Sequence, residues 1–348
     1  MRAGFHPLAV ERVEPLTGDS AAITFTVPGG LAEAFAFAPG QSLTIRRGGE
    51  RRSYSICAAA GSAPRIGVRE VAGGAVSRWL VRELKSGDTV EVQAPSGTFT
   101  PDLAVPGRHV LIAAGSGITP MMSIAASVLA ADDESTVTLL YGNRRSDTVM
   151  FADEVADLKD AYPARMNIVH VLSREAQEVD LFSGRLDRDR LTRLLPSTVN
   201  VAAVDHWWLC GPFGMITEAV EVLKGLGVDA ARIHRELFWV GDEPPPAATH
   251  EESPVSDGAR VTIVLDGRSS TLTLPGGTTI LDGAQKTRPD LPFACKGGVC
   301  GTCRAKVTTG EGTMRRNYAL ERHEVAAGYV LTCQTLPTSD EITVDYDA

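Results

Sequence analysis

The first third of the chain consists of short stretches in which apolar and polar residues alternate. Alternation with a period of two is typical of half-buried strands, and turn residues separate the stretches, as at Pro28-Gly29-Gly30. Residues 76–83 instead have helical spacing. Residues 1–105 are therefore predicted to form an antiparallel β-barrel with a single helix. Its strands are expected at residues 22–27, 42–46, 53–58, 66–71 and 89–93.

Residues 106–240 follow a different pattern, in which strand-like stretches alternate with helical ones. The alternation predicts an α/β domain with a parallel sheet and a ligand at the carboxyl ends of the strands. Strands are expected at residues 109–114, 136–142, 166–172 and 207–210, and helices from residue 121, over 151–159 and from 215.

The rest of the chain divides at a segment that cannot form a core. Residues 241–257 contain five acidic residues, four prolines and no Lys or Arg, which predicts an extended, semi-stiff linker. Residues 258–348 predict a small α+β domain with a tight turn at Asp266-Gly267. Its strands are expected at residues 260–265, 270–274, 305–308 and 341–344, with a helix at 278–285.

Composition narrows the classes of function. The 348 residues are 43% hydrophobic and carry a net charge of −9, which argues against nucleic-acid binding as the main activity. No apolar run approaches the roughly 18 residues of a membrane span, and the first residues lack the apolar core of a signal peptide. A cytoplasmic protein that does not enter the membrane is expected.

Four cysteines carry the most specific signal. Their spacing, Cys295-x4-Cys300-x2-Cys303-x29-Cys333, is that of the ligands of a plant-type [2Fe–2S] cluster. A zinc site, the main alternative, prefers two Cys-x2-Cys pairs, and a disulfide framework is typical of small secreted proteins. A [2Fe–2S] cluster moves single electrons, so the chain is expected to transfer electrons.

Other segments offer groups that bind nucleotides. Arg52, Tyr54 and Ser55 provide a guanidinium, a flat ring and a hydroxyl on one expected strand, and Gly73-Gly74 opens a helix whose first amides suit an anion. Gly115-x-Gly117 lies between a strand and a helix, without the third glycine of the dinucleotide fingerprint. Taken singly, each has a structural alternative: Arg52 as a surface charge, Tyr54 as a core aromatic, and the glycines as tight turns.

The choice of nicotinamide nucleotide follows from the end of the third strand of the α/β segment. Ser173 and Arg174 stand there, and a hydroxyl with a guanidinium suits the 2′-phosphate of NADPH. Arg144 and Arg145 follow the second strand and add positive charge. The alternative is that Arg174 belongs to a solvated loop. NADPH is therefore predicted.

In combination, these motifs resemble the ferredoxin–NADP reductase superfamily. The C-terminal cluster domain narrows the resemblance to the reductases of multicomponent oxygenases. The sequences that flank the motifs are similar to those of the reductase subunits of phenylacetyl-CoA epoxidases. This resemblance implies an FAD-binding barrel, an NADP-binding domain and a β-grasp ferredoxin domain. The motifs that carry it are Arg52-x-Tyr54-Ser55, Gly74-x-x-Ser77, Gly115-x-Gly117-Ile118-Thr119-Pro120, Cys210-Gly211-Pro212-x-Gly214-Met215 and Ala294-Cys295-Lys296-Gly297-Gly298-Val299-Cys300.

The resemblance also implies roles for single residues. Ser55, Cys210 and Glu236 are expected at the site of hydride transfer. Leu237 departs from the family ending, which usually has Arg there. FAD is expected to contact Arg52, Tyr54, Ser55, Gly74, Val76, Ser77 and Phe238, and the nucleotide Gly115, Gly117, Thr119, Pro120, Ser173, Arg174, Cys210, Gly211, Pro212 and Met215.

The implied function is electron transfer from NADPH through FAD and the cluster to an oxygenase component, with phenylacetyl-CoA epoxidase as the first candidate. Another oxygenase, such as a steroid or aromatic-ring hydroxylase, and a cluster-based redox sensor are the alternatives. The linker is expected to let the cluster domain visit the flavin and then the partner. Ten bases balance ten acids in residues 258–348, so an apolar docking patch is expected. Its candidates are Val299, Met314 and Tyr318, with ordinary core positions as the alternative.

Overall fold

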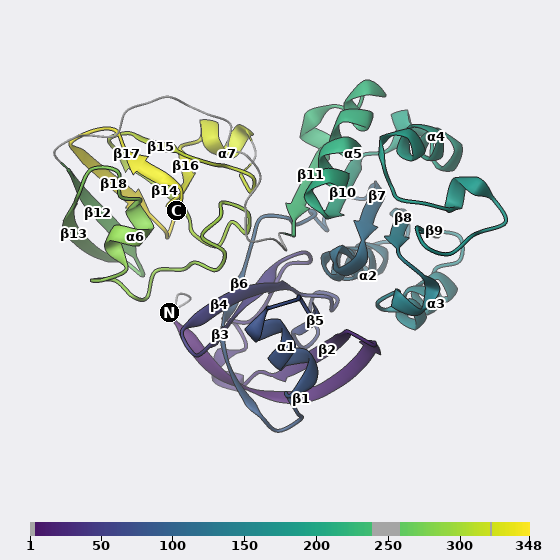
Figure 1. The fold of residues 1–348 in the computed structure, drawn as a ribbon, viewed down its shortest axis with the longest axis horizontal. Coiled ribbons are helices and arrows are strands. Elements are labelled where there is room, and N and C mark those ends of the chain that lie inside the picture. The colour runs from purple at the N-terminus through teal and green to yellow at the C-terminus, as the bar shows by residue number, and fades with distance from the viewer. Residues whose placement is uncertain (1–3, 239–257, 321) are drawn as a thin grey trace.

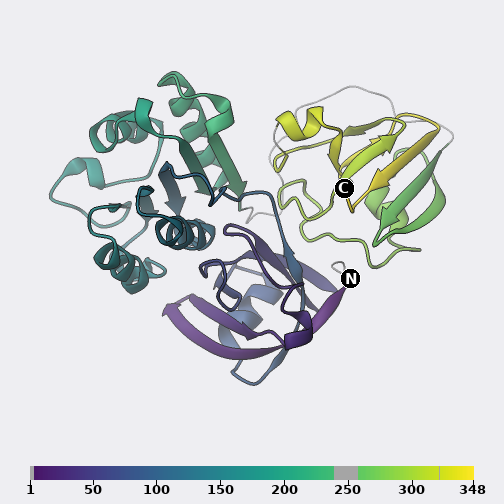
Figure 2. The same ribbon diagram turned by 180° about the vertical axis from the view of Figure 1, so that it is seen from behind.

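The computed structural model describes residues 4–238, 258–320 and 322–348. They form three lobes that surround a common centre (Figures 1 and 2). The predicted linker, residues 241–257, lies outside the described residues, and the predicted domain boundaries stay predictions. No helix of the described residues is long and apolar enough to cross a membrane.

The first lobe is a six-stranded antiparallel sheet with the order β4-β3-β6-β1-β2-β5. A bridge between Ile56 and Ile66 joins its two ends, so the sheet curls into a barrel. The helix packs its apolar face, including Val76 and Leu80, into the barrel core. The elements are β1 (Phe5–Thr17), β2 (Ser20–Thr26), β3 (Ser42–Arg47), β4 (Glu50–Ser55), β5 (Arg65–Arg69), α1 (Ala75–Arg82) and β6 (Thr89–Ser96).

Strand β1 was not predicted, because two prolines and several charged residues interrupt the alternation of apolar and polar residues along it. Pairing with β2 on one side and β6 on the other nevertheless holds it in the sheet, since tertiary context overrides local propensity.

The second lobe is a parallel sheet with the order β11-β10-β7-β8-β9 and helices on both faces. Helix α2 begins three residues earlier than predicted, at Ile118, so Pro120 lies in its first turn. Helix α4 was not predicted, although Asp187 caps it by accepting a hydrogen bond from the Arg190 amide. The elements are β7 (Arg108–Ala114), α2 (Ile118–Ala131), β8 (Thr136–Asn143), α3 (Ala152–Ala161), β9 (Met166–Leu172), α4 (Arg188–Thr198), β10 (His206–Gly211), α5 (Phe213–Gly225) and β11 (Ile233–Leu237).

The third lobe is a mixed sheet with the order β13-β12-β18-β14-β16, beside the short pair β15-β17. Its central pair, β12 and β18, is parallel. Asp266 and Gly267 both have positive φ, which is the geometry of the predicted hairpin turn. The elements are β12 (Ala259–Leu265), β13 (Arg268–Leu274), α6 (Ile280–Ala284), β14 (Arg304–Thr309), β15 (Gly312–Met314), α7 (Arg322–Ala326), β16 (Tyr329–Leu331), β17 (Thr335–Pro337) and β18 (Glu341–Asp345).

The three predicted architectures are thus confirmed: an antiparallel barrel, a parallel α/β sheet and a small α+β domain. Each has a hydrophobic core of its own. A further cluster joins the barrel to the second lobe, because buried residues from both sides, among them Phe99 and Trp208, belong to it.

Candidate functional site

Strand β4 links the three lobes through one of its faces. Side chains in a strand alternate between the two faces, so Arg51, Ser53 and Ser55 share one face. Arg51 donates to backbone carbonyls of the third lobe, and the hydroxyl of Ser53 lies 3.1 Å from that of Thr302 in the cysteine loop. Ser55 contacts the second lobe. The other face of β4 carries Arg52 and Tyr54.

The three residues expected at the site of hydride transfer lie together. The Ser55 hydroxyl donates a hydrogen bond to the Glu236 carboxylate, 3.1 Å away. Cys210 on β10 is paired with Glu236 on β11 in the parallel register, and its thiol is fully buried. Burial raises the pKa of Glu236 to about 7, against the lowering effect of the Ser55 hydrogen bond. This group is therefore poised to hold or release a proton near neutral pH.

The opposite face of β4 presents groups that suit a flavin. Tyr54 is half-buried, and burial raises the pKa of its hydroxyl. The guanidinium of Arg52 is half exposed and forms an ion pair with Glu50 at 3.0 Å. A ring and a guanidinium two residues apart on one face fit the predicted contacts with the isoalloxazine and the pyrophosphate of FAD.

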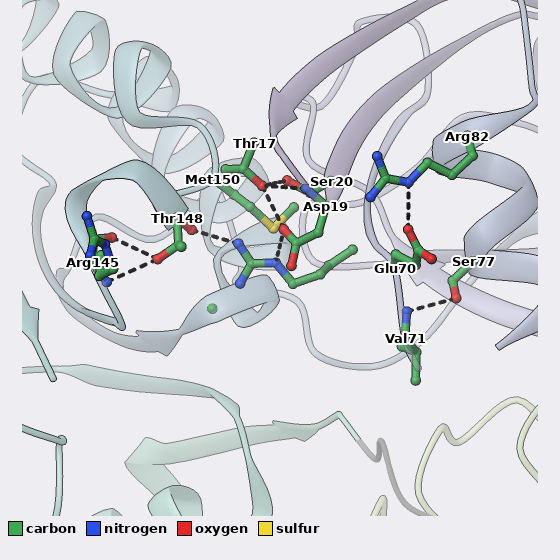
Figure 3. Close-up of polar contacts among 12 residues, drawn as sticks. Thr17, Asp19, Ser20, Glu70, Val71, Ser77, Arg82, Arg145, Thr148 and Met150 are labelled. Atoms are coloured by element: carbon green, nitrogen blue, oxygen red, sulfur yellow. Dashed lines mark hydrogen bonds and ion pairs between the residues drawn. The ribbon is translucent and has the colours of Figure 1, made fainter. Parts of the chain in front are cut away.

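The start of α1 is shaped by Ser77 rather than by its glycines alone. The Ser77 hydroxyl accepts a hydrogen bond from the Val71 amide (Figure 3) and donates one to the carbonyl of Gly74. A Cβ on Gly74 would lie 2.7 Å from this hydroxyl. The Val76 side chain is buried in the barrel core. Only the backbone amide of Val76 can therefore serve a phosphate, in line with the predicted anion site at this helix start.

The glycine turn of the second lobe brings two strand ends together. Gly115 has a φ of 54°, and a Cβ on Gly117 would overlap the carbonyl oxygen of Cys210. Glycine at these positions therefore holds the end of β7 against the end of β10. Thr119 and Pro120 are buried at the seam with the barrel, and the Thr119 hydroxyl donates to the Ser116 carbonyl. Their side chains support the turn rather than line an open surface.

The remaining residues predicted for the nicotinamide follow β10. Gly211 ends the strand, Pro212 is the N-cap of α5, and Met215 lies in the first turn of that helix. Met215 and Phe238 are half-buried, and the Phe238 amide donates to the carbonyl of Gly211. The structure therefore places Phe238 beside the Cys-Gly-Pro segment.

The residues predicted to contact a 2′-phosphate follow two neighbouring strands, β8 and β9. The amides of Ser173 and Arg174 donate to the carbonyls of Asn143 and Arg144, so the segments after β8 and β9 run side by side. The neighbouring acid, Glu175, accepts hydrogen bonds from Ser146. Arg144 and Arg174 are exposed and form no ion pair with another described residue. Arg145, in contrast, pairs with Asp147 at 3.2 Å.

A polar network at the barrel seam fixes the second lobe in place. Arg69 on β5 forms an ion pair with Asp19 at 3.2 Å and donates to the Thr148 carbonyl at 2.6 Å. Figure 3 shows Thr148 within the short turn that Arg145 begins, with Asp19 on the barrel side. Sequence reasoning found neither Arg69 nor Arg51, because nothing local distinguishes these arginines from exposed ones.

The four cysteines meet as two pairs. The Cys300 thiol lowers the pKa of Cys295, and the Cys303 thiol lowers the pKa of Cys333, because the two members of each pair are neighbours. No group of three or more His, Cys, Asp or Glu side chains among the described residues is placed to hold a single metal ion. Each iron of a [2Fe–2S] cluster takes two cysteine sulfurs in addition to the bridging sulfides. Two thiol pairs fit that donor set better than a single zinc ion.

Backbone amides surround the sulfurs. The Gly297 amide donates to the Cys295 sulfur at 3.3 Å. The amides of Val299 and Cys300 also lower the pKa of Cys295, and the amide of Gly298 lowers that of Cys333. Lys296 has a φ of 54° and Gly298 one of 78°, so left-handed residues curl the loop around its sulfurs. Such hydrogen bonds stabilise anionic sulfur and tune a cluster's potential.

The expected apolar docking patch is not an exposed surface. Val299 is 6% exposed and packs in the core of the second lobe. The ring of Tyr318 packs edge-on against Phe213 at 5.8 Å, and the Met314 sulfur accepts from the Leu331 amide. Val299 and Tyr318 thus serve contact between lobes, and Met314 serves the third lobe's own core. The sequence could not distinguish an internal interface from an external one.

A cavity of about 620 Å³ lies where the lobes meet. The barrel contributes the end of β6, the second lobe the end of β11, and the third lobe the cysteine loop. Its walls include Phe99, His234, Glu236, Cys300 and Thr302. Glu236 of the candidate hydride-transfer site and Cys300 of the cysteine loop therefore line the same cavity.

Comparison with known proteins agrees with this geometry. Residues 7–100 match the oxidoreductase FAD-binding domain, residues 111–221 the oxidoreductase NAD-binding domain, and residues 263–338 the 2Fe-2S iron-sulfur cluster binding domain. The fold is shared with phthalate dioxygenase reductase at a TM-score of 0.58 and 24% identity, over 98% of both chains.

Fold and site define an oxidoreductase that uses FAD, a nicotinamide nucleotide and a [2Fe–2S] cluster, which confirms the predicted class over the redox sensor. The chain is 43% identical to a component of the 1,2-phenylacetyl-CoA epoxidase of Escherichia coli, over 99% of this chain and 98% of that one. It is 32% identical to the ferredoxin reductase component of 3-ketosteroid-9-alpha-monooxygenase from Rhodococcus rhodochrous, over 97% and 96% of the two chains. The chain belongs to this family of oxygenase reductase components.

Proposed function

We propose that the chain passes electrons from NADPH to the oxygenase component of a phenylacetyl-CoA epoxidase. The observation that carries the proposal is the shared face of β4, where the hydroxyl of Ser53 touches the cysteine loop and that of Ser55 touches Glu236. This strand joins the flavin-binding lobe to both other lobes, at the points where electrons would arrive and leave. The acceptor is proposed from the 43% identity to the epoxidase component.

The residues of the chain bind and orient, while the cofactors supply the redox chemistry. FAD and the cluster, when bound, convert a two-electron hydride into single electrons. Tyr54 and Arg52 would hold the flavin, and Cys210 with Gly211 would limit the space for the nicotinamide. Glu236, with its pKa near 7, would hold a proton at its carboxylate beside the Ser55 hydroxyl. The four thiols would hold the two irons.

NADPH is proposed as the electron donor, and the cytoplasm, which supplies NADPH and keeps thiols reduced, as the compartment. The support is the pair of exposed arginines, Arg144 and Arg174, at adjacent strand ends. Arg174→Ala should raise KM for NADPH about ten- to a hundredfold, the effect of one charge-assisted contact, with little change for NADH. Arg145→Ala, whose side chain is already paired with Asp147, is the matched control. Equal weakening of both nucleotides by Arg174→Ala would contradict the assignment.

Reconstitution tests the acceptor. The holoprotein, NADPH, phenylacetyl-CoA and the purified oxygenase component of a phenylacetyl-CoA epoxidase should form the epoxide, and omission of the holoprotein should abolish the product. The steroid relative, at 32% identity, supplies the second candidate. Product formation with a steroid oxygenase component alone would overturn the phenylacetyl-CoA assignment while leaving the reductase class intact.

A further inference from the structure

The cysteine loop has an inner and an outer side. On the inner side, Val299 is buried against the second lobe and Thr302 contacts Ser53 of β4. On the outer side, Cys295 and Lys296 are exposed to solvent. One edge of the cluster site therefore faces the flavin-binding strand while the opposite edge stays open.

The third lobe and the barrel form a specific interface, in which a buried arginine of the barrel contacts the third lobe. Arg51, only 8% exposed, donates hydrogen bonds to the carbonyls of Leu291 and Pro289 at 2.9 and 2.8 Å. Its guanidinium also lies 4.4 Å from the ring centre of Phe293 and 5.0 Å from that of Phe5. A buried guanidinium requires such partners. Undocking would leave Arg51 with the Phe5 ring of its own lobe and without the two carbonyls and the Phe293 ring of the third lobe.

We propose that the cluster domain delivers electrons while it stays docked, receiving them on the Thr302 side and releasing them on the Cys295 side to a protein bound there. The inference deepens the proposed function and rests on it. Each electron that reaches the cluster from the flavin leaves for the oxidised metal centre of the partner. Two such passages consume the hydride that one NADPH supplies. The expected shuttling between flavin and partner is then unnecessary.

The outer side also indicates the chemistry of the partner. Lys286, Lys296 and Arg315 are exposed there, and Asp282, which pairs with Lys296 at 2.8 Å, is the acid among them. The Arg315 amide donates to the backbone carbonyl of Gln334. The Gln334 side chain in turn donates to the backbone carbonyl of Lys296, so Gln334 connects the two basic residues. A basic rim on a chain of net charge −9 favours an oxygenase surface that presents carboxylates.

Bridging the lobes tests whether undocking is needed. Phe213→Cys and Tyr318→Cys replace the ring pair between the second and third lobes, and a short bis-maleimide can join the two thiols in the holoprotein. We expect the bridged protein to reduce the oxygenase component within about twofold of the unbridged double variant. A loss beyond about tenfold, with NADPH still reducing the cluster, would overturn the proposal. Each single variant treated with the reagent is the control.

Loosening the interface is the complementary test. Arg51→Ala should slow NADPH-driven cluster reduction about tenfold or more, with NADPH-to-FAD reduction unchanged and partial rescue by Arg51→Lys. Its chemically reduced cluster should still reduce the oxygenase at the wild-type rate. Faster overall delivery by Arg51→Ala would show that undocking limits the reaction and would overturn the proposal.

Hydrogen exchange on the complex gives a readout that does not depend on turnover. Binding of the oxygenase component should protect residues 295–297, while β4 keeps its protection. Exposure of β4 on binding would overturn the proposal.

Lys286→Glu should weaken binding of the oxygenase component and flatten the salt dependence of that binding, whereas Arg260→Glu, at an exposed arginine of β12, should do neither. If the unbridged protein fails to reduce this oxygenase, the proposed function is wrong. Docked delivery is then tested separately, by comparing the bridged and unbridged proteins with cytochrome c as the electron acceptor.

Discussion

Lowering the pH should destabilise the second lobe through one buried histidine. His109 on β7 is 3% exposed, and its Nδ1 accepts a hydrogen bond from the indole of Trp208 at 3.1 Å. Burial, and next the neighbouring His206, lower the pKa of His109 from 6.5 to about 4. Between these two values the unfolded chain binds a proton that the folded chain does not, so stability must fall as the pH falls. At pH 5 the difference amounts to about 2 kcal/mol relative to pH 7.5.

Urea unfolding followed by tryptophan fluorescence measures this difference, because Trp207 and Trp208 are buried in the same strand, β10. Burial also lowers the pKa values of His170 and His206, so the wild type is compared with His109→Gln. The variant should lose about 2 kcal/mol less than the wild type between pH 7.5 and 5. His323→Gln, at an exposed histidine, is the control. Identical losses in wild type and His109→Gln would refute the reasoning.

Three further predictions address the site and its seams. Cys300→Ser should abolish reduction of the oxygenase component and lower the iron content, while NADPH still reduces FAD; an unchanged iron content would contradict the ligand assignment. Glu236→Gln should remove an inflection near pH 7 from the pH profile of NADPH-to-FAD reduction, since the carboxyl is protonated below its pKa of about 7 and ionised above it; an inflection that persists would assign the titration to another group. Gly67→Ala should cost about 1–3 kcal/mol of stability, because a Cβ there would overlap the Thr119 side chain and lie 2.7 Å from the Phe151 ring; Gly18→Ala, in open space, is the control, and equal losses would contradict the packing argument.

Local patterns predicted what depends on local structure. The fold of each lobe followed from the period of its hydrophobic positions. The cysteines followed from their spacing, because three of the four lie in one short loop with fixed gaps and Cys333 completes the ligand motif. Contacts between lobes have no such signal. Arg51 and Arg52 are neighbours in sequence, yet the first is a buried anchor and the second is half exposed. Val299 and Tyr318 read as surface or core equally well, because the lobe that covers them lies far away in the sequence.

The length of the hairpin turn between β3 and β4 fixes which face of the sheet each side chain of β4 occupies. Gly48 and Gly49, both with positive φ, connect β3 to β4 in a two-residue turn that sets the pairing of Leu43 with Tyr54. One residue more or less in this turn would rotate every later side chain of β4 to the opposite face. Tyr54, which is predicted to stack on the flavin, would then face the third lobe. Arg51, which anchors the third lobe, would face the flavin site. The two-residue glycine turn therefore determines which cofactor site each side chain of β4 faces. Single-residue insertions in this turn should disable electron transfer without unfolding the barrel.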